Sequence, residues 1–144
     1  MEDALSLRIV DWPEAEALVM PLREAVFVVE QGVPAELERD EFDAVSRHAV
    51  AQDTNGAVIA TGRLLPDGHV GRMAVAANAR GRGVGGRVLE ALVAEAGVRG
   101  LAEVVLNAQL QAEAFYRRHG FVPEGGVFLD AGIEHRCMRR PCRG

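Results

Sequence analysis

Hydrophobic and polar positions alternate over residues 5–10, which predicts a first strand. Further strand-like runs cover residues 47–52, 58–65 and 69–75. The turns between these three runs are rich in Asp, Asn, Gly and Pro, as tight turns are. Three successive strands with tight turns predict an antiparallel meander.

Other segments have the 3.6-residue spacing of helices. After Pro13, a helical pattern continues to about Glu30, and Pro21 inside it predicts a kink or a break. From Val84 onward, apolar residues recur on one helical face, as expected of a helix that packs on a sheet. A third helical stretch covers residues 112–119 and is followed by a glycine, which is a common helix end.

The rest of the chain completes an α+β architecture. Strand-like runs at 103–106, 121–128 and 133–139 bring the expected mixed sheet to six or seven strands. The stretch from Gly32 to Asp43 is expected to be a loop or a short helix. The 144 residues contain no internal repeat or linker, so they fit one small domain.

Charge is distributed unevenly along the chain. Residues 1–45 carry 12 acidic residues and three arginines, and the remainder carries nine acidic residues and 13 arginines. A nucleic-acid-binding protein would show a basic surface without this acidic counterpart, so we expect no nucleic-acid partner. No apolar run is long enough for a membrane span, and the acidic start does not resemble a secretion signal. We therefore expect a cytoplasmic protein with no membrane partner.

Cysteine and histidine are too sparse to indicate a metal. Cys137 and Cys142 are the two cysteines, and in a cytoplasmic protein we expect them to be reduced. The chain has no His or Cys cluster with the spacing of metal ligands. We expect no metal site.

The strongest chemical signal is the stretch 80–86, Arg-Gly-Arg-Gly-Val-Gly-Gly, between the strand that ends at Val75 and the helix that starts at Val84. Its glycines can adopt positive φ, so that successive backbone N–H groups point into one concavity. The helix adds the positive end of its dipole at the same place. The stretch therefore predicts a pyrophosphate site, with Arg80 and Arg82 available for charge-assisted contacts.

Gly81, Gly83 and Gly86 also satisfy G-x-G-x-x-G, the fingerprint of dinucleotide-binding domains. Three details oppose that interpretation: other residues separate the strand from the first glycine, the next strand ends in Asn107 instead of an acid, and the preceding meander is antiparallel. A Walker loop is excluded because the chain has no Gly-Lys-Ser/Thr.

In a second register, residues 80–85 read Arg-x-x-Gly-x-Gly, which resembles the pyrophosphate motif of the GCN5-related N-acetyltransferase (GNAT) superfamily. Residues 114–121, Ala-Phe-Tyr-Arg-Arg-His-Gly-Phe, are similar to the F-Y-x-x-x-G-F signature of that superfamily. The order of elements matches over almost the whole chain. Segments 22–31 and 130–135 resemble the ElaA-like branch, which commonly has proline where this chain has Glu134.

The resemblance implies a GNAT-like domain over residues 1–144, with a mostly antiparallel sheet and about four helices. The implied activity is direct transfer of an acetyl group from acetyl-CoA to a primary amine, on a small molecule or a peptide. The resemblance is compatible with a monomer or a homodimer. A non-catalytic acyl-CoA-binding regulatory module on the same fold is the alternative, and such a module would not require Tyr116.

The resemblance also assigns residues to coenzyme A. Its pyrophosphate would be bound by the glycine-rich turn, which comprises Arg80, Gly81, Arg82, Gly83, Val84, Gly85 and Gly86. The strand residues Met73, Ala74 and Val75 would hydrogen-bond the pantetheine amides, and Asn107 would also reach this arm. A strand N–H near Val75 would stabilise the tetrahedral oxyanion. Tyr116 would donate a proton to the leaving thiolate.

The acceptor side is less clearly marked. An amine must lose a proton before it attacks, and the candidate bases are Glu30, Glu41, His48, His135 and water. The acidic stretch 36–43 lies in the region that lines the acceptor cleft in this family. An acidic rim there favours a cationic acceptor.

Overall fold

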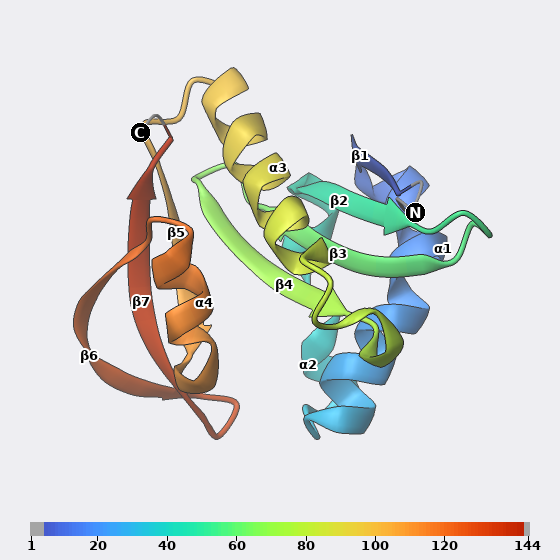
Figure 1. Cartoon of the computed structure of the whole chain (residues 1–144). Coiled ribbons are helices and arrows are strands. Elements are labelled where there is room, and N and C mark those ends of the chain that lie inside the picture. The colour runs from blue at the N-terminus through green and yellow to red at the C-terminus, as the bar shows by residue number, and fades with distance from the viewer. Residues whose placement is uncertain (1–4, 143–144) are drawn as a thin grey trace.

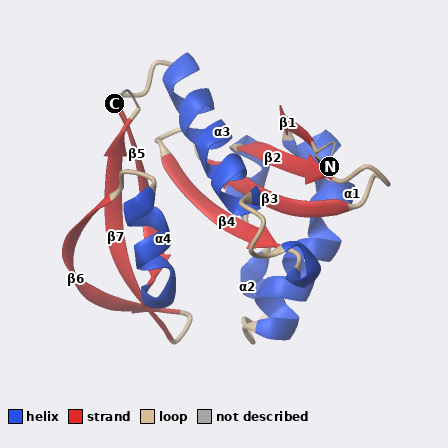
Figure 2. Cartoon of the chain, viewed as in Figure 1, coloured by secondary structure: helices blue, strands red, loops and turns tan. Residues whose placement is uncertain are grey.

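Seven strands form one sheet covered by helices on both faces, in a computed structural model that describes residues 5–142 (Figures 1 and 2). The strands are β1 (Ser6–Val10), β2 (Arg47–Gln52), β3 (Val58–Leu64), β4 (His69–Val75), β5 (Glu103–Gln109), β6 (Val122–Asp130) and β7 (Ile133–Pro141). Their order in the sheet is β1-β2-β3-β4-β5-β7-β6. The predicted α+β class and the antiparallel meander are confirmed.

Four α-helices and several shorter helical segments accompany the sheet. The α-helices are α1 (Trp12–Arg23), α2 (Ala35–Glu38), α3 (Val84–Val98) and α4 (Glu113–Arg118). The shorter segments are a π-helical stretch, η1 (Glu24–Glu30), and the 3₁₀ helices η2 (Glu41–Val45), η3 (Ala77–Ala79) and η4 (Leu110–Ala112). Within residues 5–142, no helix combines the length and the apolar character needed to cross a membrane.

Side-chain alternation on β2 shows how the two helical layers are held. Ala49 and Ala51 are fully buried and belong to the main core, which packs the sheet against α3. Val50, between them, points to the other face and packs with Val19 of α1. Each face of the meander therefore has its own apolar layer.

Two sequence-based boundaries are corrected by the structure. The first helix does not break at Pro21 but continues to Arg23, after which the chain widens into the π-helical turns of η1. The fifth strand does not end near Asn107, because β7 pairs with it as far as Gln109. Asn107 therefore lies inside β5, opposite Cys137.

The sheet opens between its two middle strands. β4 and β5 are parallel and pair only at His69–Val105 and Val70–Leu106. Beyond these two pairs the strands separate, and Figure 1 shows β4 diverging from β5 and β7. The remainder of β4 is left without a partner strand on that side.

A bulge interrupts β4 just beyond the last pair with β5. Thr61 pairs with Ala74 and Arg63 pairs with Gly71, so two residues of β4 oppose Gly62. One of them, Arg72, has a φ of 50°, in the left-handed region. A Cβ on Gly62 would lie 2.6 Å from the sulfur of Met73 and 2.9 Å from Cδ1 of Leu92, so a larger residue there would require these side chains to move.

Candidate active site

A cleft follows the gap between β4 and β5 and is lined from both halves of the sheet. On the expected cofactor side the lining includes the turn before α3 and α4. On the expected acceptor side, called the acceptor-side wall here, it includes η1, α2 and the β6–β7 hairpin. Among the lining residues are Met73, Val75, Gly83, Asn107, Tyr116 and His135. The cleft thus brings together residues from both the expected cofactor side and the expected acceptor side.

The glycine-rich turn has the geometry of an anion site. Gly81 and Gly83 have φ values of 82° and 78°, and no atom lies within 4 Å of where their Cβ atoms would be. Gly83 is the N-cap of α3, and within the described chain no side chain caps that helix. The N–H groups of the first turn are therefore available to an anion, at the positive end of the helix dipole.

Gly85 and Gly86 serve close packing. A Cβ on Gly85 would lie 3.3 Å from Cγ2 of Val75, so the small residue lets α3 begin directly against the end of β4. A Cβ on Gly86 would lie 2.8 Å from Nε2 of His119, which follows α4. The two glycines therefore bring the start of α3 close to β4 and α4, beside the cleft.

Arg80 faces a carboxylate of the acceptor-side wall. Its Nη1 and Nη2 donate to the two carboxylate oxygens of Glu30, at 3.0 and 2.7 Å, and its Nε donates to the carbonyl of Val75 at 3.0 Å. The hydrogen bond from Arg80 holds the pKa of Glu30 below its usual value. Arg82 is exposed and donates to the carbonyl of Asn78 at 3.0 Å.

The unpaired part of β4 exposes backbone groups to the cleft. The N–H of Ala76 donates to the carbonyl of Ile59 on β3, at 2.8 Å. Because the bonding direction alternates along an antiparallel strand, the N–H of Val75 points the other way, into the gap. By the same alternation the N–H of Ala74 faces β3, although Ala74 also lines the cleft.

Tyr116 lies in α4 with its ring packed against other aromatic residues. The ring centroids of Phe115 and Phe121 are 5.1 and 5.9 Å away, in edge-to-face contacts. Burial raises the pKa of Tyr116 to about 12, so the phenol keeps its proton at neutral pH. Within residues 5–142 its hydroxyl makes no hydrogen bond, which leaves it available as a donor in the cleft.

Three of the candidate bases are poorly placed. His48 is 1% exposed, its Nε2 is 2.9 Å from the carbonyl of Asp43, and it is not among the residues described as lining the cleft. Burial lowers its pKa. Glu41 is exposed on η2 and is also not among those residues. Glu30 does line the cleft, but both of its carboxylate oxygens are bonded to Arg80.

His135 does line the cleft, on β7 opposite Gln109 of β5. Its Nδ1 is 2.7 Å from the carbonyl of Ile133, which can only accept, so Nδ1 carries the proton. The neutral ring then has its lone pair on Nε2. The ring is largely buried and stacks on Phe128, with the centroids 5.9 Å apart.

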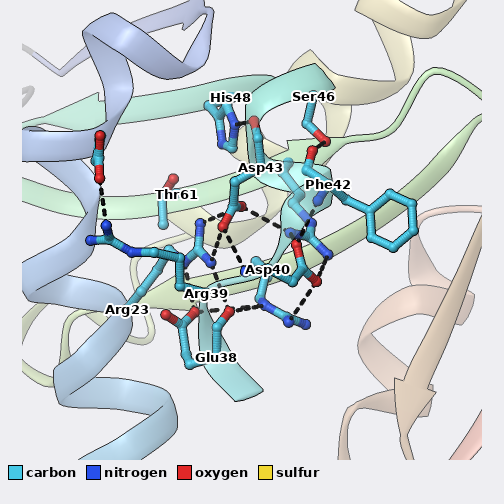
Figure 3. A network of polar contacts seen from close by, with 12 residues as sticks. Arg23, Glu38, Arg39, Asp40, Phe42, Asp43, Ser46, His48 and Thr61 are labelled. Atoms are coloured by element: carbon cyan, nitrogen blue, oxygen red, sulfur yellow. Dashed lines mark hydrogen bonds and ion pairs between the residues drawn. The ribbon is translucent and has the colours of Figure 1, made fainter. Parts of the chain in front are cut away.

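The acidic segment around α2 and η2 does not form a free acidic rim (Figure 3). Arg23 of α1 donates to Glu38 at 2.7 Å and to Asp43 at 2.8 Å. Arg63 of β3 donates to Asp40 at 2.7 Å and to Asp43 at 2.8 Å. The expectation of a solvent-facing acidic rim is therefore wrong for these three carboxylates, because arginines from other elements neutralise them.

Charge pairing also sets the ionisation of this network. Burial alone would raise the pKa of Asp40 and of Asp43. Arg63 and Arg72 outweigh burial at Asp40, and Arg23 and Arg63 outweigh burial at Asp43, so both pKa values stay below their usual range. The carboxylates are thus charged at neutral pH, and they fix the segment onto α1 and β3.

The sequence analysis missed two features of the cleft. Gln109 of β5 donates from Nε2 to Oε1 of Gln31 at 2.9 Å, which joins the two walls across the gap. His119 contacts Oε2 of Glu90 through Nδ1 at 2.7 Å and packs its ring on Phe115. Gln31 stood inside the ElaA-like segment, but no local pattern indicated its partner.

Comparisons with known proteins agree with this geometry. Residues 12–142 match the family described as "Acetyltransferase (GNAT) domain". The uncharacterized N-acetyltransferase YjcF of Bacillus subtilis is 43% identical over 122 residues, covering 83% of this chain and 87% of YjcF.

Solved structures are similar over nearly the full length. An acyl-CoA N-acyltransferase from Pseudomonas aeruginosa superposes with a TM-score of 0.85 at 33% identity, covering 95% of this chain and 99% of that one. ElaA of Escherichia coli superposes with a TM-score of 0.84 at 28% identity, covering 94% of this chain and 99% of ElaA.

Proposed function

The chain belongs to the GNAT acetyltransferase family, and on that premise we propose that this N-acetyltransferase moves the acetyl group of acetyl-CoA directly to a primary amine. The observation that carries the proposal is the open gap between β4 and β5. At one end of the gap lies the uncapped start of α3, and the partly buried phenol of Tyr116 also lines the cleft. The start of α3 suits a bound pyrophosphate, and the phenol of Tyr116 suits a leaving thiolate.

Cofactor binding is assigned to backbone groups above all. The N–H groups of the turn 81–86 would bind the pyrophosphate, and the exposed edge of β4 would pair with the pantetheine amides as an added strand does. Asn107 lines the same cleft and is exposed on β5, where its amide is available to pantetheine. The N–H of Val75, which points into the gap, would stabilise the oxyanion of the tetrahedral intermediate.

Tyr116 would assist departure of the thiolate. A thiol has a pKa of about 8.5, so complete proton transfer from a phenol of pKa about 12 would be uphill by roughly 5 kcal/mol. The hydroxyl therefore acts as a hydrogen-bond donor to the developing negative charge on sulfur. Such a bond strengthens in the transition state, where that charge appears.

His135 is our candidate for the base. The amine nitrogen attacks the thioester carbonyl carbon, the carbon–sulfur bond breaks, and the nitrogen loses one proton. Nε2 of His135 has the free lone pair to accept that proton, because Nδ1 is bonded to the carbonyl of Ile133. The other candidate bases are buried, paired with Arg80 or outside the described lining of the cleft.

The test is acetyl transfer itself, followed by free thiol release and by mass spectrometry of the amine product. We expect thiol release that depends on an amine and a product heavier by one acetyl group. His135→Gln should lower kcat/KM at neutral pH by about 10²-fold, with the deficit shrinking as alkaline solution deprotonates the amine. Thiol release that is independent of any amine would argue against the proposal.

A further inference from the structure

Several acids at the acceptor-side wall of the cleft are paired with arginines. Three acids of the segment around α2 and η2, Glu38, Asp40 and Asp43, form ion pairs with three arginines, Arg23, Arg63 and Arg72. Figure 3 labels the three acids and Arg23. Glu36 and Glu41 of the same segment are exposed but are not among the residues described as lining the cleft. These three paired acids therefore offer no net negative charge to a polycationic substrate.

Arg72 fixes this wall against the open strand. Its left-handed conformation in the bulge of β4 accompanies a side chain that crosses to the segment Ala35–Val45. Nε donates to the carbonyl of Glu38 at 2.9 Å, and Nη2 donates to the carbonyl of Leu37 and to Oδ2 of Asp40, each at 3.2 Å. The segment is thus tied to the strand that borders the reaction site.

Besides the paired acids Glu38 and Asp40, the tied segment presents two large apolar side chains to the cleft. Leu37 and Phe42 both line the cleft, although 55% and 46% of their surfaces are exposed. Phe27, Val33 and Ile133 line the cleft as well. Large apolar side chains held open to solvent inside a concave site indicate an apolar ligand.

One carboxylate remains for a single positive charge. Asp130, in the β6–β7 hairpin, lines the cleft and has no ion pair within residues 5–142. The other lining acids, Glu30, Glu38, Asp40 and Glu90, are all ion-paired. A cleft that combines a single free carboxylate with large apolar lining residues fits a monoamine better than a polyamine.

We propose that the acceptor is a primary monoamine with an uncharged, apolar body, which packs on Leu37 and Phe42 while the amine faces the reaction site. This inference rests on the proposed acetyl transfer and adds the acceptor class. It narrows the cationic acceptor expected from the sequence to a monocation with an apolar body, because three of the acids behind that expectation are paired with arginines within the fold.

The experiment compares three acceptors with acetyl-CoA: 2-phenylethylamine, spermidine and glutamate. We expect kcat/KM for 2-phenylethylamine to exceed that for the other two by at least about 10-fold, with little dependence on salt. Leu37→Ala and Phe42→Ala should each raise the KM for 2-phenylethylamine about 5- to 10-fold and leave the KM for acetyl-CoA unchanged.

Leu129→Ala is the matched control. Leu129 is 70% exposed on β6 and is not among the residues described as lining the cleft, so its truncation should change neither KM. A preference for spermidine or glutamate, or wild-type KM values in both cleft variants, would overturn the acceptor class while leaving acetyl transfer intact. Failure of every amine to release thiol would overturn both proposals.

Discussion

Arg80 holds both carboxylate oxygens of Glu30, and through Nε it also holds the carbonyl of Val75. One side chain thus joins η1 to the end of β4, at the entrance to the glycine-rich turn. The pair matters electrically because an unneutralised Glu30 would repel a pyrophosphate bound nearby. Arg80 therefore both holds η1 against the end of β4 and supplies positive charge.

This relationship predicts an unusual double-mutant result. Arg80→Ala should weaken acetyl-CoA binding by about 1.5–3 kcal/mol, since it removes a cation and exposes the carboxylate of Glu30. Glu30→Gln removes the repulsion, so adding it to Arg80→Ala should restore part of the affinity. Isothermal titration calorimetry of the four proteins measures both effects. If the double variant binds no better than Arg80→Ala, the electrostatic role of Glu30 is wrong.

Two glycines of helix α3 should respond differently to replacement by alanine. Gly86→Ala places a Cβ 2.8 Å from Nε2 of His119, so the ring must move and the affinity for acetyl-CoA should fall. Gly97→Ala meets nothing closer than 3.7 Å and should leave binding unchanged, with stability equal or higher by up to about 1 kcal/mol. Measurements of acetyl-CoA affinity and of thermal unfolding for Gly86→Ala and Gly97→Ala test these expectations. Equal affinities would show that the contact with His119 is unimportant.

The buried network predicts a large loss of stability from a small change. Asp43→Asn keeps the volume but leaves Arg23 and Arg63 short of a counter-charge, so the free energy of unfolding should fall by about 3–5 kcal/mol. Glu36→Gln removes an exposed acid from the same segment and should change it by less than about 0.5 kcal/mol. Urea denaturation measures the free energy of unfolding of both variants. Similar losses in Asp43→Asn and Glu36→Gln would contradict a stabilising role for the paired network.

The pKa of His48, which burial lowers, predicts how stability depends on pH. The folded protein holds this histidine neutral, while the unfolded chain takes up a proton below about pH 6.5. The free energy of unfolding should therefore fall as the pH drops below that value, by at most about 1.4 kcal/mol per pH unit from this group. In His48→Gln the free energy of unfolding should fall less steeply with decreasing pH, by the contribution of this one group. If the free energies of unfolding of the wild type and His48→Gln decline equally with falling pH, His48 does not contribute to this dependence.

Local patterns predicted the fold well. The strands Arg47–Gln52 and His69–Val75 begin and end as expected, because turn residues mark both ends of the meander strands. The two left-handed glycines before α3 were likewise readable from a short motif. These features depend on neighbours in sequence, which is why periodicity and turn chemistry reveal them.

Long-range pairing could not be predicted in the same way. Nothing near Asp43 indicated that Arg23 and Arg63, each 20 residues away, would neutralise it. The bulge at Arg72 equally depends on how β4 pairs with β3 around Gly62. A run of acids has the same local pattern whether it is solvated or buried against arginines, so the sequence could not show that Glu38, Asp40 and Asp43 are paired.

The most direct test of the account is Tyr116→Phe, measured for both acetyl-CoA binding and turnover with an accepted amine. The hydroxyl makes no hydrogen bond within residues 5–142, so its loss should leave stability and acetyl-CoA affinity nearly unchanged. We predict a fall in kcat of about 10²-fold, since the bond to sulfur forms only as the thiolate departs. Turnover within a factor of three of the wild type across the pH range would contradict a catalytic role for Tyr116.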